Sequence, residues 1–90
     1  MNKPDPQYES LRVPPHSIES EQSVLGGLLL DNAAWDRVAD FINADDFYRY
    51  DHRIIFQAIV KLITASRPAD VITVFEELNG LGKADEVGGL

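Results

Sequence analysis

The sequence predicts an all-α fold, a small irregular bundle of about five helices. Apolar residues recur at helical spacing in several separate segments, and no segment alternates at period two with β-branched enrichment. Capping and helix-breaking residues separate these segments from one another. With 90 residues, 44% of them apolar and 26% charged, the chain has the length and composition of one globular domain.

The N-terminal stretch differs from the rest of the chain. Residues 1–13 hold two prolines, alternating charges and no apolar period, which predicts a disordered or extended arm before a helical domain over residues 14–90. Ser17 is the expected N-cap of a first helix that runs to about Leu30. The residues expected on its apolar face are Ile18, Val24, Leu25, Leu28 and Leu29.

A second helix is expected after a short break. Asp31-Asn32 ends the first helix and caps the second, which runs from Ala33 to about Ile42, and residues 43–46 form a turn. Phe47 follows as an anchor into the core. The residues that share the apolar side of the second helix are Trp35, Val38, Ala39 and Ile42.

The third predicted helix, residues 51–66, is the central one, and Pro68 follows its end. Only a narrow polar strip interrupts its apolar surface, and such a helix is surrounded by others. The residues of its apolar arc are Ile54, Ile55, Phe56, Ala58, Ile59, Val60, Leu62 and Ile63.

A fourth helix is expected over residues 71–78, capped by Asp70. Asn79-Gly80 predicts a left-handed C-cap with Leu81 folding back onto the helix, and Asp85-Glu86 begins a further short segment. The residues expected to face inward are Val71, Ile72, Val74, Phe75 and Leu78.

Charge and cysteine content narrow the function classes. The chain has 15 acidic and 8 basic residues, a net charge of −7, and its basic residues are scattered singly, so we expect no direct binding of nucleic acid. Without cysteine, neither a disulfide nor a thiolate zinc site can form. The apolar run Val24–Leu30 is too short to span a bilayer, so we expect a cytoplasmic protein with no membrane partner.

No catalytic, cofactor or metal residues are predicted. The only dense cluster of metal-ligand types is Asp45, Asp46, Asp51 and His52. We favour a structural interpretation, in which the first two residues form a turn, Asp51 complements a helix dipole and His52 faces the core. A helix-turn-helix interpretation is disfavoured, because its recognition helix would present Glu76 and Glu77 to phosphates.

Glu21 projects onto the apolar face of the first helix, between Leu25 and Leu28. A buried carboxylate needs a partner, which the backbone N–H groups of that helix end or Arg53 could supply. A functional interpretation is an acid of perturbed pKa in a cleft, and we favour the structural one.

A stripe of small residues lines the opposite side of the first helix, at Ser20, Ser23, Gly26 and Gly27. Small residues let another backbone approach closely, and the stripe leaves open whether that neighbour belongs to this chain or to another molecule. The residues predicted to contact another subunit or protein are Glu19, Ser20, Ser23 and Gly27.

Several strings resemble the N-terminal domain of the DnaB-type replicative DNA helicases, in order and spacing, from Val13 to Leu90. They are Pro14-Pro15-His16-Ser17-Ile18-Glu19, Glu21-Gln22-Ser23-Val24-Leu25-Gly26, Asp46-Phe47-Tyr48, His52 with Ile55-Phe56, Pro68 with Asp70 and Thr73-Val74, and Glu86-Val87-Gly88-Gly89-Leu90.

The resemblance implies a role in DNA replication. Such helicases are ring hexamers that use ATP and Mg²⁺ in a separate C-terminal, RecA-like motor domain to unwind DNA. Their N-terminal domain forms a collar of paired subunits and helps bind the primase. We therefore expect a module without catalysis or cofactor, whose partners are primase, other helicase subunits and a helicase loader. In the family the domain continues past Gly88-Gly89-Leu90 into a helical hairpin that makes the dimer contacts, so we expect a C-terminally truncated piece.

Two other function classes remain as alternatives. One is a free-standing helical DNA-binding domain. The other is a small hydrolase or metal enzyme that uses Asp45, Asp46, Asp51 or His52.

Overall fold

The computed structural model describes residues 17–87, and within this range the chain is helical with no strand. The elements in chain order are α2 (Ile18–Leu30), η1 (Asn32–Ala34), α3 (Trp35–Val38), η2 (Ala44–Asp46), α4 (Tyr50–Thr64), α5 (Val71–Gly80) and η3 (Ala84–Val87), where η denotes a 3₁₀-helix. The all-α prediction is therefore confirmed. The arm expected over residues 1–13 lies outside the described residues.

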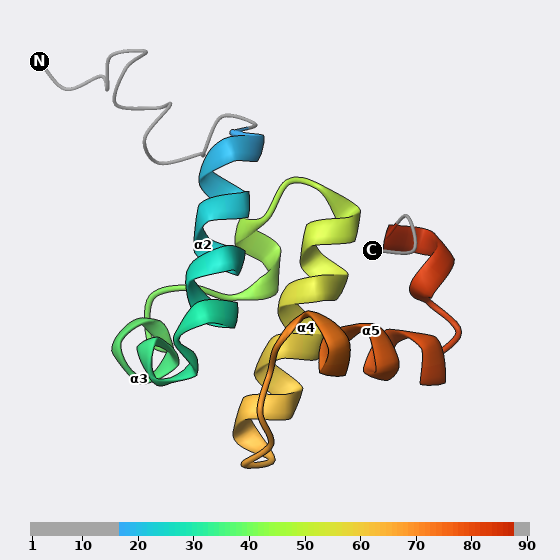
Figure 1. Ribbon diagram of the computed structural model, residues 1–90. Coiled ribbons are helices and arrows are strands. Elements are labelled where there is room, and N and C mark those ends of the chain that lie inside the picture. Colours follow the sequence, from blue (N-terminus) through green and yellow to red (C-terminus); the bar gives the residue numbers. More distant parts are fainter. Residues whose placement is uncertain (1–16, 88–90) are drawn as a thin grey trace, which may run out of the picture.

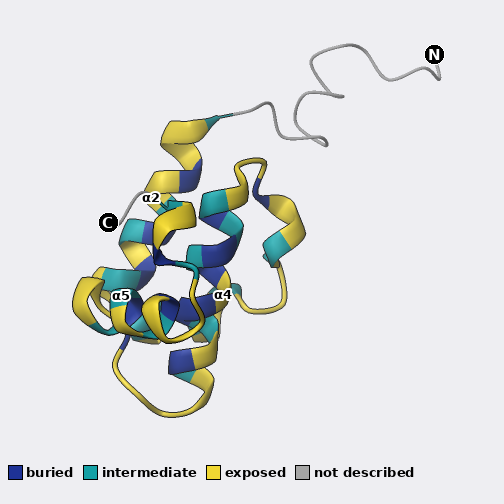
Figure 2. Ribbon diagram, turned by 90° about the vertical axis from the view of Figure 1, so that its right-hand side faces the viewer, coloured by how far each residue is buried: buried dark blue, intermediate teal, exposed yellow. Residues whose placement is uncertain are grey.

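Helix α4 is the centre of the bundle, as its apolar arc predicted. It contacts α2 on one side and α5 on the other, and α2 and α4 run in the same direction (Figure 1). Ile59 and Leu62 are fully enclosed, and buried residues gather along α4 while the outer surfaces of its neighbours are exposed (Figure 2). The residues that α4 buries are His52, Ile54, Phe56, Ala58, Ile59 and Leu62.

The predicted helix caps are present. Ser17 Oγ accepts a hydrogen bond from the Ser20 amide at 3.2 Å, and Asp31 Oδ1 accepts one from the Ala33 amide at 3.1 Å. Asp70 caps α5 in a reciprocal capping box with Thr73. Each cap satisfies an amide that the first turn of a helix leaves without a partner.

The second predicted helix, Ala33 to Ile42, is largely wrong in length. The chain forms the 3₁₀ turn η1, then a single α-helical turn in α3, and bends after Val38. After Val38 the pattern of hydrogen bonds tightens: the Phe41 amide donates to the Val38 carbonyl three residues back, at 2.9 Å, and the Ile42 amide donates to the same carbonyl at 3.1 Å. Residues 39–41 therefore form a turn rather than a further turn of α-helix. Phe47 is buried in the core, as predicted.

The C-cap prediction for the fourth helix is also wrong by two residues. Gly80 is still helical, and Gly82 is the residue with a left-handed φ of 73°. The Lys83 amide donates to the Leu78 carbonyl at 2.8 Å, which completes a Schellman motif around Gly82. Leu81 does not fold back onto the helix and is exposed.

Four residues expected on inward apolar faces are exposed instead: Ile18, Ala39, Val71 and Ile72. Ile18 lies in the first turn of α2. The N-terminal end of α2 extends past the start of α4 (Figure 1). Helix α5 uses Val74 and Leu78 as its buried positions, and its first turn is therefore open to solvent. The arc of residues expected to face inward on α5 was too wide, because this helix packs on one side only.

Candidate interaction surface

A buried carboxylate–histidine pair joins α2 to α4. Glu21 and His52 are only 8% and 5% exposed, and Glu21 Oε1 lies 2.6 Å from His52 Nδ1. The other carboxylate oxygen, Oε2, accepts a hydrogen bond from the Tyr48 amide at 2.6 Å, and Oε1 accepts a longer one from the Arg49 amide at 3.4 Å. One side chain of α2 thus holds both the first turn of α4 and the segment before it.

The surroundings of Glu21 favour its ionised form. Burial acts to raise the pKa of this carboxyl, but the hydrogen bonds from the Tyr48 amide, from His52 and from the Arg49 amide outweigh it. The pKa of Glu21 therefore lies below its ordinary value. A carboxylate held in this way is a structural acceptor, which agrees with the structural interpretation of Glu21.

The partners predicted for Glu21 were wrong in detail. Arg53 instead donates to two backbone carbonyls, those of Phe47 at 2.7 Å and Tyr48 at 3.3 Å. The amides that serve Glu21 come from residues 48 and 49 rather than from its own helix end. His52 was expected on the apolar arc, and its pairing with a carboxylate 31 residues away left no local signal in the sequence.

Asn32 makes a second polar connection, between the end of α2 and the loop before α5. Its side-chain amide donates to the carbonyls of Leu28 at 2.7 Å and of Ala69 at 2.9 Å. Its Oδ1 accepts from the Ala69 amide at 2.9 Å. Both backbone groups of the buried Ala69 are therefore satisfied by one side chain.

The predicted interaction residues Glu19, Ser20, Ser23 and Gly27 are all exposed on α2. A Cβ atom added at Gly27 would meet no atom within 4 Å, so no part of residues 17–87 packs closely against that glycine. Ser23 and Gly27 instead border a shallow hollow of about 330 Å³ whose far side includes Arg37 and Val38. Within the described chain, this face of α2 is open.

Three members of the cluster of metal-ligand types, Asp46, Asp51 and His52, have separate structural roles, and Asp45 is exposed. Asp46 accepts from the Asn43 amide at 2.9 Å, and Asp51 forms a bidentate pair with Arg49 at 2.9 and 2.7 Å. His52 is engaged by Glu21. Within residues 17–87, no group of three His, Asp or Glu residues is arranged to hold a metal ion.

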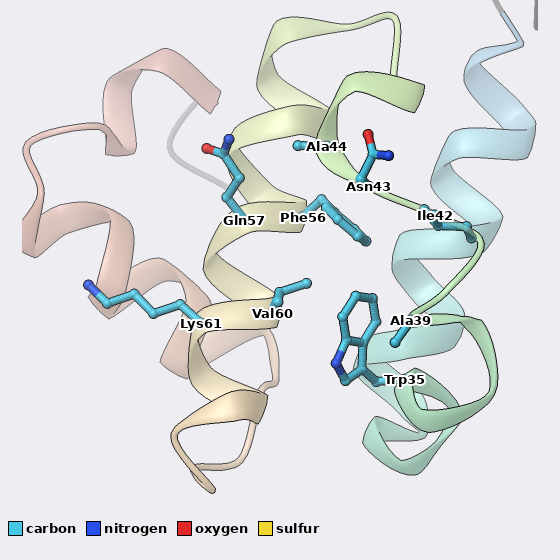
Figure 3. A pocket seen from close by; sticks show the side chains of 9 residues that line it. All are labelled: Trp35, Ala39, Ile42, Asn43, Ala44, Phe56, Gln57, Val60 and Lys61. Atoms are coloured by element: carbon cyan, nitrogen blue, oxygen red, sulfur yellow. The ribbon is translucent and has the colours of Figure 1, made fainter.

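Two further grooves lie on the surface. One, of about 410 Å³, separates α4 from residues 35–44, and Figure 3 shows Trp35 and Phe56 inside it. The other, of about 290 Å³, lies between α2 and α5, next to the exposed Val71. Among the helices of residues 17–87, none has the length and apolarity needed to cross a lipid bilayer.

Together these features define a class of protein: a small helical domain, braced by a buried Glu–His pair, with an open face on α2 and grooves on its surface. Residues 13–90 match the family described as "DnaB-like helicase N terminal domain", and the chain belongs to this family.

Relatives and a solved structure agree with this assignment. The chain is 51% identical over 82 residues to the replicative DNA helicase DnaB of Buchnera aphidicola subsp. Acyrthosiphon pisum, and 45% identical over 85 residues to that of Haemophilus influenzae. These matches cover 91% and 94% of the chain but only 18% of each relative. The crystal structure of the N-terminal domain of DnaB helicase from Mycobacterium tuberculosis superposes with a TM-score of 0.79 at 40% identity, over 83% of this chain and 54% of that one.

Proposed function

We propose that this chain is an N-terminal interaction and assembly domain of a replicative DNA helicase, contributing to the collar of the hexamer and to primase binding. Its partners are other helicase subunits, primase and a helicase loader, in the cytoplasm. The proposal assigns no catalytic step to these residues. ATP and Mg²⁺ belong to the motor domain of the parent helicase.

The open face of α2 is the observation that carries the proposal. Ser20, Ser23 and Gly27 present small, exposed groups on one side of a helix, and a Cβ added at Gly27 would meet no atom. The opposite side of the same helix is fixed to α4 through the buried Glu21. Because its side chains are small and exposed and its helix is fixed to α4, this surface suits close approach by a second protein.

The charges of the domain support a protein partner over a nucleic acid. Three of the basic side chains are paired with carboxylates: Arg37 with Asp31, Arg49 with Asp51 and Lys61 with Glu77. A fourth, Arg53, is occupied by backbone carbonyls. These cations are thus already engaged, and the net charge of −7 repels phosphates.

The test is a bulky substitution on the α2 face in a helicase that carries this domain. We expect Ser23→Trp, or Gly27→Trp, to weaken hexamer assembly or primase association in sedimentation and pull-down measurements while the circular dichroism stays unchanged. Glu76→Trp, at an exposed position of α5, is the matched control. If Ser23→Trp instead lost helicity, the stripe of small residues would be packed inside the domain rather than at a contact with another protein. If association were unchanged, the proposed surface would be rejected.

Two simple measurements distinguish the proposed function from the two alternatives, a DNA-binding domain and a metal enzyme. A DNA-binding domain would bind a single-stranded oligonucleotide in a salt-dependent manner near ~50 mM salt, and we expect no binding by the 90-residue chain. A metal enzyme would gain thermal stability from an added divalent cation, and we expect no change.

A further inference from the structure

The groove between α2 and α5 has aliphatic walls and a buried histidine among its lining residues. Its volume is about 290 Å³, and α4, which contacts both of the other helices, contributes His52 and Ile55 to it. The other aliphatic lining residues are Leu25, Leu29, Val71 and Val74. Because His52 is only 5% exposed while Gln22, the other polar lining residue, is exposed, the histidine is the polar group at the inner side of the groove.

One nitrogen of His52 is engaged and the other is not. Nδ1 lies 2.6 Å from Glu21 Oε1, and no described residue forms a hydrogen bond with Nε2. Among residues 17–87, every side-chain nitrogen or oxygen that is wholly enclosed has a hydrogen-bond partner. Nε2 is therefore not wholly enclosed, and the groove that His52 lines gives access to it.

The pairing with Glu21 determines which groups Nε2 can bind. The ionised Glu21 carboxylate can only accept, so Nδ1 carries a proton. Nε2 then accepts a hydrogen bond in the neutral ring and donates one in the imidazolium. A hydroxyl meets both cases because it donates and accepts. An anionic group is disfavoured, since Glu21 lies directly behind the ring and the chain carries a net charge of −7.

The walls and the size of the groove specify what carries this hydroxyl. Aliphatic walls favour an apolar body, and a tyrosine side chain joins an aromatic ring to a hydroxyl at its tip. Sites for free small molecules usually have volumes of about 300–1,000 Å³, so this groove suits a single large side chain better.

Apolar surface continues beyond the groove, as expected for a contact with a protein. Val71 at its edge is 58% exposed. Ile18, one turn before Gln22 on the same stripe of α2, is 40% exposed. A protein that inserted a tyrosine here would cover both, and tyrosine is among the residues that contribute most to the binding energy of protein interfaces.

We infer that this groove binds a tyrosine side chain of a partner protein, with the ring between α2 and α5 and the hydroxyl hydrogen-bonded to His52 Nε2. The groove is separate from the hollow beside Ser23 and Gly27. The inference rests on the proposed interaction role and adds the chemistry of one contact.

The probes are N-acetyl-tyrosinamide and N-acetyl-phenylalaninamide, which differ by one hydroxyl. Each is titrated into the ¹⁵N-labelled 90-residue chain, and the backbone amides and the imidazole nitrogens of His52 are followed by NMR. We expect amide shifts at Gly26 and Val71 with both compounds, and a shift of the His52 Nε2 signal with the tyrosine compound alone. The tyrosine compound should bind ~3- to 10-fold more tightly, since one hydrogen bond has a modest net value. Equal affinities, an unchanged Nε2 signal, or no amide shift in the groove would overturn the inference.

A variant that fills the groove tests its location. Gly26 lines the groove and a Cβ there would meet no atom within 4 Å, so Gly26→Leu places a side chain in the groove while the helix is retained. It should weaken binding by ~10-fold or more, because the leucine and the tyrosine ring compete for the same space. Gly80→Leu makes the same change at an exposed helical position outside the groove and should leave the affinity within about twofold. Equal effects of the two substitutions would contradict the inference.

Two further measurements identify other occupants. Tyr8→Ala should leave the affinity for the tyrosine compound unchanged; tighter binding in this variant would mean that the chain's own Tyr8 occupies the groove. The affinity should also be independent of protein concentration, because weaker binding at higher concentration would indicate that a second copy occupies the groove. Either result would overturn the inference of a separate partner.

Failure of the groove and failure of the proposed function remain distinguishable. If the tyrosine compound does not bind while Ser23→Trp impairs assembly or primase association, the groove inference is wrong and the proposed function stands. If neither effect is seen, both are wrong.

Discussion

Glu21 Oε1 lies 2.6 Å from His52 Nδ1 in the buried contact between α2 and α4. Because the same carboxylate also accepts from the Tyr48 amide, it ties α2 to the segment that leads into α4. The open face of α2, with Ser23 at its middle, is therefore held in place by a polar pair on the opposite side of the helix. A substitution at Glu21 should therefore lower the stability of the fold, and it should affect the open face of α2 only as a consequence of that loss.

Glu21→Gln should destabilise the domain by about 2 kcal/mol, because the amide cannot replace a charged acceptor for three donors. Urea unfolding of the variant, followed by circular dichroism, measures this. Glu19→Gln is the matched control: Glu19 is exposed in the same first turn, and its change should stay within about 0.5 kcal/mol. Equal effects of the two substitutions would show that the Glu21–His52 pair has no special role.

The lowered pKa of Glu21 predicts an acid-labile fold. Since the folded state holds this pKa below its ordinary value, the unfolded chain takes up the proton first as pH falls. The stability contributed by Glu21 is therefore fully present above its unfolded pKa, about 4.3, and is lost as the pH falls through the folded value.

Urea midpoints measured between pH 7 and pH 3 test this dependence. The urea concentration at the midpoint of unfolding should decrease for the wild-type protein once the pH is lowered below about 5. For the Glu21→Gln variant this decrease should be shallower, because the variant lacks the titrating group. Asp51, whose pKa is lowered by its hydrogen bond from Arg49, titrates in both proteins and does not affect the difference. Identical slopes would contradict the assignment of the pH effect to Glu21.

Asn32→Ala should cost about 1–3 kcal/mol, because it leaves both backbone groups of the buried Ala69 without their partner. Thermal unfolding measures the loss. Asn79→Ala serves as the control, since Asn79 is exposed on α5 and alanine favours a helix, so no destabilisation is expected there. A wild-type melting temperature for Asn32→Ala would mean that water replaces the side chain at no cost.

Hydrophobic period and capping chemistry predicted the central helix and three of the caps correctly, because both signals are local. The apolar arc of α4 and the caps Ser17, Asp31 and Asp70 can be read within one or two helical turns. The length of α3 could not be predicted in this way. The α-helix ends at Val38, where the Phe41 amide donates to the Val38 carbonyl three residues back and the chain forms a turn.

The polar contacts of the site were predicted only in part, for a related reason. Glu21 projected onto an apolar face, which left its burial undecided, and its partner His52 is 31 residues away along the chain. Asn32 and Ala69 are separated by 37 residues. Such pairs depend on how α2, α4 and the loop before α5 are placed, and helical periodicity carries no information about that placement.

The two glycines at the end of α5 should respond to alanine in opposite directions. Gly80 is helical and a Cβ there would meet no atom within 4 Å, so Gly80→Ala should stabilise the domain by about 0.5–1 kcal/mol. Gly82 has a φ of 73°, where an alanine is strained, so Gly82→Ala should destabilise by about 1 kcal/mol. Urea unfolding of both variants under one condition gives the two values. If Gly80→Ala were the destabilising change, Gly80 would be the left-handed cap after all, and the Schellman motif would not centre on Gly82.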